Sequence, residues 1–367
     1  MEKEFYYYWL ANVPGIGRMT MKKLLEVTTP EKLYKNGFKG MEEILKKSQL
    51  EAWEKYAQTS IFRQEWKKLQ EEGIQFLCPE SEAYPKKLGQ IPDPPLTLYK
   101  KGRMESMEVP SVAVVGARNC SAYGSLAAKE LGRELAGQGI TVISGMARGI
   151  DGISQWSALE ADGESIGVLG SGVGVCYPKE NRPLYERLQK QGCILSENPP
   201  HTAPRPGLFP LRNRLISGLA DALVVVEAGE KSGTLITVDM ALEQGKEIYA
   251  MPGRITDKLS GGCNRLIGQG AEILLSPREF ARQMAERLGT RRKEEREQKG
   301  ESVMTMREES IFAVLEPLPM SVEEIWQRGR EKNPGLTLAQ VMEDLLALVM
   351  KGRVRTHEQY FYRAYFG

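Results

Sequence analysis

The sequence predicts an α/β fold built on a doubly wound, mostly parallel sheet, and three observations support it. Between residues 111 and 288, short apolar runs alternate with helical stretches. The runs are short and mostly apolar, which is typical of strands buried on both faces. Glycine, serine, proline or another small residue stands at or next to the end of each run, where parallel strands turn into helices. The seven predicted strands span 112–117, 141–147, 165–172, 193–197, 222–228, 247–253 and 271–277.

Two regions precede this sheet domain. Residues 1–70 place aromatic and leucine side chains among Lys and Glu, which predicts a helical domain of SAM-like or helix-hairpin-helix-like type. Its Pro14-Gly15-Ile16-Gly17 turn either contacts DNA phosphates through backbone amides or simply connects two packed helices. Residues 71–110 contain six prolines, so we expect an extended connector packed on the core.

Two further regions follow the sheet domain. Residues 289–304 are predicted to be a charged linker, because eleven of the sixteen residues from Glu286 to Glu301 are charged. Residues 305–367 predict three helices and a small hairpin, a winged-helix-like domain. The last of these helices, 336–352, has no arginine and a single lysine. A packing or protein-interaction module is therefore favoured over recognition of a duplex.

Composition argues against several functional classes. The 367 residues include 50 basic and 48 acidic side chains, so any basic surface must be local. Two histidines argue against a multi-histidine metal site and against a Ser-His-Asp triad. Five cysteines without CxxC spacing predict buried thiols in a reducing compartment. The N-terminus does not read as a signal peptide, no membrane span is expected, and we predict neither a metal nor a cofactor.

Small residues and cations follow several of the predicted strands. Glycine allows a phosphate to approach the backbone, and a nearby cation supplies charge. Because ligands of such sheets bind beyond the carboxyl ends of the strands, these turns predict a phosphate-binding edge. Asp151, at the second turn, either caps the next helix or bonds an arginine, and a structural role is favoured. The residues of this set are Gly116, Arg118, Ser144, Gly145, Arg148 and Lys179.

The stretch from Phe209 to Gly253 carries the strongest signal. An Arg-Asn-Arg triplet precedes an apolar strand, which a Ser-Gly-Thr turn then joins to a helix. A strand that passes through a small hydroxyl-bearing turn into a helix cradles phosphate well, and guanidinium groups suit phosphate oxygens. The residues concerned are Arg212, Asn213, Arg214, Ser232, Gly233 and Thr234.

The two arginines of the triplet are predicted to differ in role. Consecutive helical residues point about 100° apart, so Arg212 and Arg214 cannot both face the anion. One is expected to contact the anion, and the other to pair with an acid such as Glu227 or Asp239. Which arginine does which is left open by the pattern.

Two common nucleotide-binding motifs are missing. No GxGxxG follows the first strand, and the glycines of LGSGVG at 169–174 have the wrong spacing, so NAD binding is disfavoured. GEKSGT at 229–234 does not satisfy GxxxxGK[ST], because its lysine precedes the serine. ATP hydrolysis is therefore not supported.

A family resemblance covers roughly residues 80 to 280. The blocks VAVVGAR, SGMARGID, GVLGSGVGVCYPKEN, LSENPP, FPLRNRLISGLADALVVVEAGEKSGTLITVDMALEQGKEIYAMPG and SGGCNRLIGQGAEIL follow the order seen in the DNA-processing protein A (DprA/Smf) family. The resemblance implies a Rossmann-like core with accessory domains. It also implies a cytoplasmic bacterial protein that binds single-stranded DNA, forms a homodimer and helps to load the RecA recombinase, notably during natural transformation. It implies no established catalysis.

The resemblance also points to individual residues. It singles out Gly116, Arg118, Lys179, Arg205, Phe209, Arg212, Asn213, Arg214 and Ser232 to Thr234. Phe209 is expected either to stack a base or to pack the loop. Two positions depart from the family: Ser154-Gln155 replace an Ala-His pair, and Gly174 stands where aspartate is usual. Both departures weaken an enzymatic interpretation.

Two further predictions concern an alternative enzymatic function and a homodimer interface. The alternative function is a nucleotide phosphoribohydrolase-type enzyme with Glu227 or Glu243 as the catalytic carboxylate, although the usual Pro-Gly-Gly-x-Gly-Thr turn is missing. The apolar segment 266–275 is expected at a sheet edge, where it would form a homodimer unless the charged helix after Pro277 covers that edge. The predicted interface residues are Leu266, Ile267 and Ile273.

Overall fold

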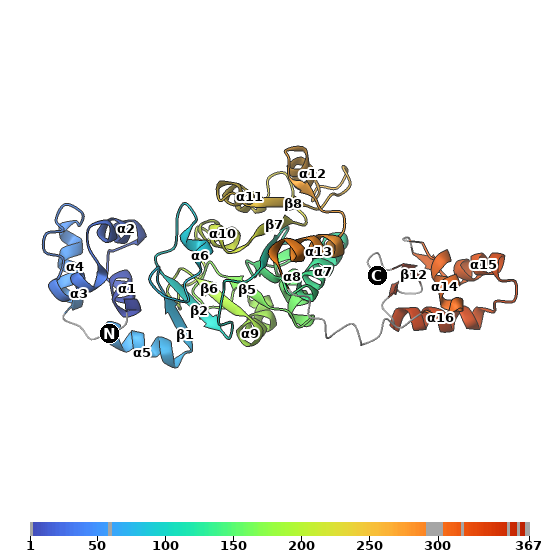
Figure 1. Cartoon of the computed structure of the whole chain (residues 1–367), viewed down its shortest axis with the longest axis horizontal. Coiled ribbons are helices and arrows are strands. Elements are labelled where there is room, and N and C mark those ends of the chain that lie inside the picture. Colours follow the sequence, from blue (N-terminus) through green and yellow to red (C-terminus); the bar gives the residue numbers. More distant parts are fainter. Residues whose placement is uncertain are drawn as a thin grey trace. The chain divides into compact units, whose positions relative to one another are not determined.

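The computed structural model describes residues 3–57, 61–290, 304–316, 319–350, 353–357 and 360–363. The chain forms two compact units, Met1–Lys293 and Glu294–Gly367. The helices and strands of both units are labelled in Figure 1.

The first unit is built on a nine-stranded sheet with the order β1-β2-β6-β5-β4-β3-β7-β8-β9. The seven predicted strands all form and run parallel. They end one to four residues earlier than predicted, because the small residues at their carboxyl ends leave the ladder to form turns. The strands are β3 (Ser111–Val115), β4 (Thr141–Ser144), β5 (Ser165–Val168), β6 (Cys193–Ser196), β7 (Ala222–Val225), β8 (Glu247–Ala250) and β9 (Glu272–Ile273).

The proline-rich segment 71–110 differs from the extended connector that was predicted. It contains β1 (Ile74–Leu77) and β2 (Leu98–Gly102), which pair antiparallel and join the sheet beside β6, and the short helix α6 (Lys86–Gly89). Its prolines lie outside both strands, so they remove no ladder hydrogen bond. Packing on the core is as expected, since Leu88 and Leu98 are fully buried.

Helices cover both faces of the sheet (Figure 1). Alternate strand residues point to opposite sides, so Val112 and Val114 pack against α7 while Ala113 and Val115 pack against α10. The first face carries α7 (Ala122–Gly137), α8 (Ile150–Glu160), α9 (Arg182–Gln191) and α13 (Pro277–Leu288). The second carries α6, α10 (Leu208–Leu219), α11 (Thr234–Glu243) and α12 (Gly261–Gly268).

The N-terminal helices share an aromatic core. Phe5, Trp9 and Tyr34 pack together with Phe62 and Trp66. The predicted Pro-Gly-Ile-Gly turn joins the first two helices and buries Ile16. The helices are α1 (Lys3–Asn12), α2 (Arg18–Val27), α3 (Pro30–Asn36), α4 (Lys47–Ala57) and α5 (Ile61–Glu71).

The second unit has the three predicted helices and hairpin, with one short strand that was not predicted. A small sheet in the order β10-β12-β11 packs with the helices. The winged-helix assignment stays a prediction, and residues 291–303 of the proposed linker lie outside the described residues. The elements are α14 (Met306–Val314), β10 (Met320–Ser321), α15 (Val322–Lys332), α16 (Leu338–Met350), β11 (Val354–His357) and β12 (Tyr360–Arg363).

All five cysteines are free thiols, and three of them are buried. Within the described ranges, no helix is long and apolar enough to cross a bilayer. The same residues hold no group of three or more His, Cys, Asp or Glu side chains that could bind a metal ion.

Candidate nucleic-acid interface

The sheet reverses its winding between β3 and β7. From β3 the chain builds β4, β5 and β6 outward on one side, and then returns to place β7 on the other. Loops at such a point diverge and leave a crevice beyond the carboxyl ends of the strands. Here the loops after β3 and β7 line a cleft of about 870 Å³.

The cleft is electropositive. Arg118, Arg212, Lys231 and Lys258 line it, whereas Asp151 is the sole carboxylate among the described residues around it. Arg118, Lys231 and Lys258 are exposed, and they form no ion pair within the part of the chain that the structure describes. Three hydrated cations without acidic partners are suited to an anionic ligand.

A helix begins at the same place. The first turn of α11 has no acidic residue, and Ser232, Gly233 and Thr234 form the turn that leads into it. Ser232 Oγ accepts a hydrogen bond from the Thr234 amide at 3.2 Å and donates to Thr234 Oγ1 at 3.0 Å. The amide end of a helix adds positive potential to that of the side chains.

Arg212 and Asp151 form the buried floor of the cleft. Arg212 is 7% exposed, and its Nη1 donates to the carbonyl oxygens of Gly145, at 2.9 Å, and Val168. Burial lowers the pKa of Arg212 to about 10, so the guanidinium is still charged at neutral pH. Burial raises the pKa of Asp151, and the charge of Arg212 opposes that shift. Asp151 also accepts the Gly145 amide at 3.1 Å, so it has a structural role, but it holds the turn after β4 and does not cap α8, one of the two predicted roles.

The loop that carries Arg118 is held in place by Glu227, the residue that follows β7 and its short extension. Ser121 caps α7 by accepting the Gly124 amide at 3.0 Å. The amide and the hydroxyl of Ser121 both donate to Glu227, which follows β7. This buried carboxylate therefore holds the start of α7 against the neighbouring strand, and it leaves Arg118 at the mouth of the cleft.

Arg118 lies beside one ring of a stacked aromatic pair. Phe209, in the first turn of α10, stacks with Tyr177 at a centroid distance of 5.4 Å and an interplanar angle of 28°. The Arg118 guanidinium lies 5.9 Å from the centroid of Phe209. All three residues line the cleft.

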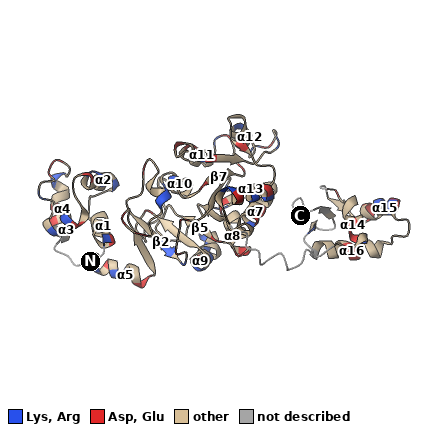
Figure 2. Ribbon diagram, in the orientation of Figure 1, with Lys and Arg blue, Asp and Glu red and all other residues tan. Residues whose placement is uncertain are grey.

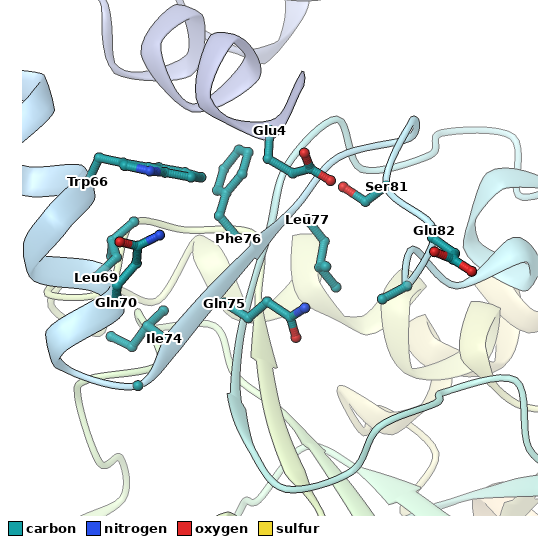
Figure 3. A pocket seen from close by; sticks show the side chains of 12 residues that line it. Glu4, Trp66, Leu69, Gln70, Ile74, Gln75, Phe76, Leu77, Ser81 and Glu82 are labelled. Atoms are coloured by element: carbon teal, nitrogen blue, oxygen red, sulfur yellow. The ribbon is translucent and has the colours of Figure 1, made fainter. Parts of the chain in front are cut away.

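A second hollow, of about 670 Å³, lies where α5 meets β1 (Figure 3). Trp66, Leu69 and Phe76 point toward it from these two elements. Its charged lining residues among those described are Glu4 and Glu82, both acidic. This hollow repels phosphate, so the cleft between β3 and β7 is the better anion site.

Known proteins that are similar to this chain identify its family. The model of the DNA recombination-mediator protein A family matches residues 75–285, which is more than half of the chain. The chain belongs to this family. It is 41% identical to DNA processing protein DprA of Bacillus subtilis over 218 residues, or 59% of this chain and 73% of that protein. Over 202 residues it is 41% identical to protein Smf of Escherichia coli, and there the match spans 54% of the relative.

Solved structures of the family share this fold. DprA from Streptococcus pneumoniae superposes with a TM-score of 0.63 at 30% identity, over 76% of this chain and 97% of the other. DprA from Helicobacter pylori, whose structure is described by its single-stranded DNA binding mode, superposes with a TM-score of 0.54 at 30% identity. That match covers 58% of this chain and 97% of the H. pylori protein. The Rossmann-like core predicted from the sequence is thus the fold of the family.

The fold brings most of the predicted site residues together. Eight of them line the cleft: Gly116, Arg118, Phe209, Arg212, Asn213, Ser232, Gly233 and Thr234. Gly145 and Arg148 line a small recess beside it, of about 40 Å³. Their individual DNA contacts stay predictions.

The other predicted contacts lie elsewhere. Ser144 is fully buried and donates to the Val114 carbonyl at 2.6 Å, so it supports the strand. Lys179 and Arg205 are exposed but line neither the cleft nor the recess. Asn181, just after Lys179, donates to the carbonyls of Met146 and Ala147 and so fixes this loop.

Arg214 pairs with different acids from those predicted. Its Nη2 donates to both carboxylate oxygens of Glu197, at 2.8 and 2.9 Å, and its Nε donates to the Asp93 carbonyl at 3.0 Å. Glu227 is held by Ser121 and is not the partner, and Asp239 is exposed on α11. The predicted partners of Arg214 were wrong because the sequence did not indicate that the end of β6, where Glu197 lies, packs next to α10.

Two cations and an aromatic ring that line the cleft were not among the predicted contacts. Lys231 precedes the Ser-Gly-Thr turn and was considered only as part of a failed ATP-binding motif. Tyr177 was included only within the family block GVLGSGVGVCYPKEN. Lys258 lies between β8 and α12, in a loop without a motif, so only the tertiary structure brings it to the cleft.

The carboxylates proposed for an enzyme do not line the cleft. Glu227 is engaged with the start of α7. Glu243 is exposed and is the last residue of α11. The Ser232-Gly233-Thr234 turn lies at the opposite end of this helix, at its start. The remaining acid, Asp151, is buried beneath Arg212.

The predicted dimer segment forms an edge. Ile273 is 47% exposed and Leu275 is 73% exposed, whereas Leu266 and Ile267 pack partly against the core. The helix α13 packs on α7 and, through Phe280, on Tyr249 of β8, and Leu274 of the predicted segment belongs to the same apolar cluster. Charged residues of both signs are interspersed along α13 (Figure 2).

Proposed function

We propose that this chain binds single-stranded DNA in the cleft between β3 and β7 and acts as a cytoplasmic recombination mediator. It would load the RecA recombinase on the bound strand, as during natural transformation, and act as a homodimer. The observation that carries the proposal is that three exposed cations, which form no ion pair among the described residues, converge with the start of a helix in one cleft.

A single strand fits this cleft better than a duplex does. The lining offers cations, amides and two aromatic rings. Such groups grip the backbone and stack on bases of any kind, as nonspecific single-strand sites do. The H. pylori relative is described as binding single-stranded DNA. The match covers 97% of that protein and 58% of this chain.

The test is titration of the full chain with a labelled single strand and with the matching duplex across a salt series. We expect tighter binding of the single strand, little dependence on base sequence and a log–log salt slope of about 0.7 per phosphate contact. Equal or tighter binding of the duplex would contradict the proposal.

The finer parts of the proposal need their own readouts. Loading is tested by whether the chain shortens the lag of RecA filament assembly on strands coated with single-strand-binding protein. The hydrolase alternative is tested by incubation with nucleoside monophosphates and measurement of free base. Release of base together with absent strand binding would favour the enzyme.

A further inference from the structure

Tyr177 presents an aromatic ring at the mouth of the cleft. Its side chain is 42% exposed, although tyrosine usually buries much of its ring. It lines both the cleft and the small recess beside it. The ring therefore stands where a strand entering the cleft passes.

This ring has a firm backing. Phe209 stacks behind it at 5.4 Å and is itself fixed in the first turn of α10. Gly170 lies against the Phe209 ring, and a Cβ added there would come within 2.9 Å of Phe209 Cδ1. A ring held in place loses little side-chain entropy when a ligand packs on it.

The Phe209 ring already has two partners within the protein. The Tyr177 ring is stacked on it, and the Arg118 guanidinium lies over it at 5.9 Å from the centroid. Phe209 is half-buried, and its ring already contacts Tyr177 and Arg118. A base that enters the cleft finds its open aromatic face on Tyr177.

We propose that Tyr177 is the platform on which a base of the bound single strand stacks, and that Phe209 is the positioning residue that holds this platform. The inference rests on the proposed function. In this proposal Arg118, Lys231 and Lys258 contact phosphates of the strand, and Tyr177 contacts a base. Every base has a π face, so the contact is tolerant of sequence.

The experiment compares two probes on the full chain. One is a thymidine strand, and the other is a strand of equal length made of abasic sites, which keeps the phosphates and lacks the bases. Tyr177→Ala is expected to weaken binding of the thymidine strand by about five- to a hundredfold. It should leave both the affinity for the abasic strand and the salt slope unchanged.

Matched variants control for folding. Tyr177→Phe keeps the ring and should bind as the wild type does, and Tyr360→Ala removes an equally exposed tyrosine from the second unit without effect. If Tyr177→Ala lowers the melting temperature, Tyr177→Leu keeps the bulk without a π face and takes its place.

The outcomes separate the two claims. Wild-type protein that binds neither probe would overturn the proposed function itself. Wild-type protein that binds, with a Tyr177 variant that binds the thymidine strand equally well, would overturn the platform. An equal loss of affinity for the thymidine strand and the abasic strand would also overturn the platform. It would mean that Tyr177 contacts phosphates or stabilises the fold.

Discussion

Arg118 is the cation best placed to hold a phosphate, because it is exposed at the mouth of the cleft and next to a glycine turn. We expect Arg118→Ala to weaken binding of all single strands by a similar factor and to lower the log–log salt slope by about 0.7. Fluorescence anisotropy at several salt concentrations measures both.

The control for this substitution is Arg282→Ala, which removes an exposed arginine from α13 that pairs with Glu279 and Glu286. It should leave binding unchanged. If Arg118→Ala kept the full slope and the melting temperature, Arg118 would only shape its loop.

Arg214 is expected to act on stability. Its side chain is buried against Glu197, so its removal leaves that carboxylate with little compensation. Arg214→Ala should lower the free energy of unfolding by about 2–3 kcal/mol, somewhat below a fully buried pair because Glu197 is partly exposed. Urea denaturation followed by circular dichroism measures this change.

Single-strand affinity of folded Arg214→Ala should stay within about threefold of wild type, since a change of less than 1 kcal/mol is expected for a side chain outside the cleft. Arg282→Ala serves again as the comparison, with a stability change within about 0.5 kcal/mol. An Arg214 variant with normal stability and lost binding would reverse the roles of the two arginines.

At the scale of elements, the site depends on how the turns of neighbouring strands interlock. The turn after β4 receives the Arg212 side chain from α10 and the Asp151 carboxylate from α8. A Cβ at Gly145 would lie 2.5 Å from Arg212 Nη2 and 2.7 Å from its Cζ. The glycine is therefore required by the close approach of a buried guanidinium.

Gly145→Ala is expected to displace Arg212 and to lower the free energy of unfolding by about 1–3 kcal/mol, the usual cost of overpacking. Binding of single-stranded DNA should weaken as the floor of the cleft shifts. Thermal melting and anisotropy together test both effects.

Gly137→Ala is the paired control, because a Cβ there meets no atom within 4 Å. It lies at the last residue of α7, where alanine is neutral or slightly stabilising. A Gly145 variant that behaved like the Gly137 variant would show that Arg212 does not need this turn.

At the scale of the whole molecule, the exposed edge beside β9 is the predicted site of dimerisation. Ile273 and Leu275 are exposed there, while Ile267 packs partly on the core. A charge at Ile267 would therefore disturb folding as well as association. Ile273→Lys is the cleaner probe.

Ile273→Lys should convert dimers to monomers in light scattering at micromolar concentration. Affinity for short strands should persist, whereas affinity for strands that reach two pockets should fall by about tenfold or more, because avidity is lost. The Arg282→Ala variant, with a surface change on α13, should remain dimeric. A monomeric wild type would refute the dimer.

The sequence by itself determined the seven parallel strands and their order of appearance. Short runs rich in β-branched residues such as 222–226 favour buried strands, and the small residues that follow them favour turns whichever strands they pair with. Motif order also pointed to the family, and eight of the predicted contacts do line one cleft.

Tertiary structure decided the pairing of distant groups. Arg214 meets Glu197, Phe209 meets Tyr177, and Lys258 reaches the cleft from a loop without a motif. The strands β1 and β2 likewise became visible only once paired with each other and with β6. Such contacts depend on how the chain returns across the sheet, and local propensity and spacing carry no information about that path.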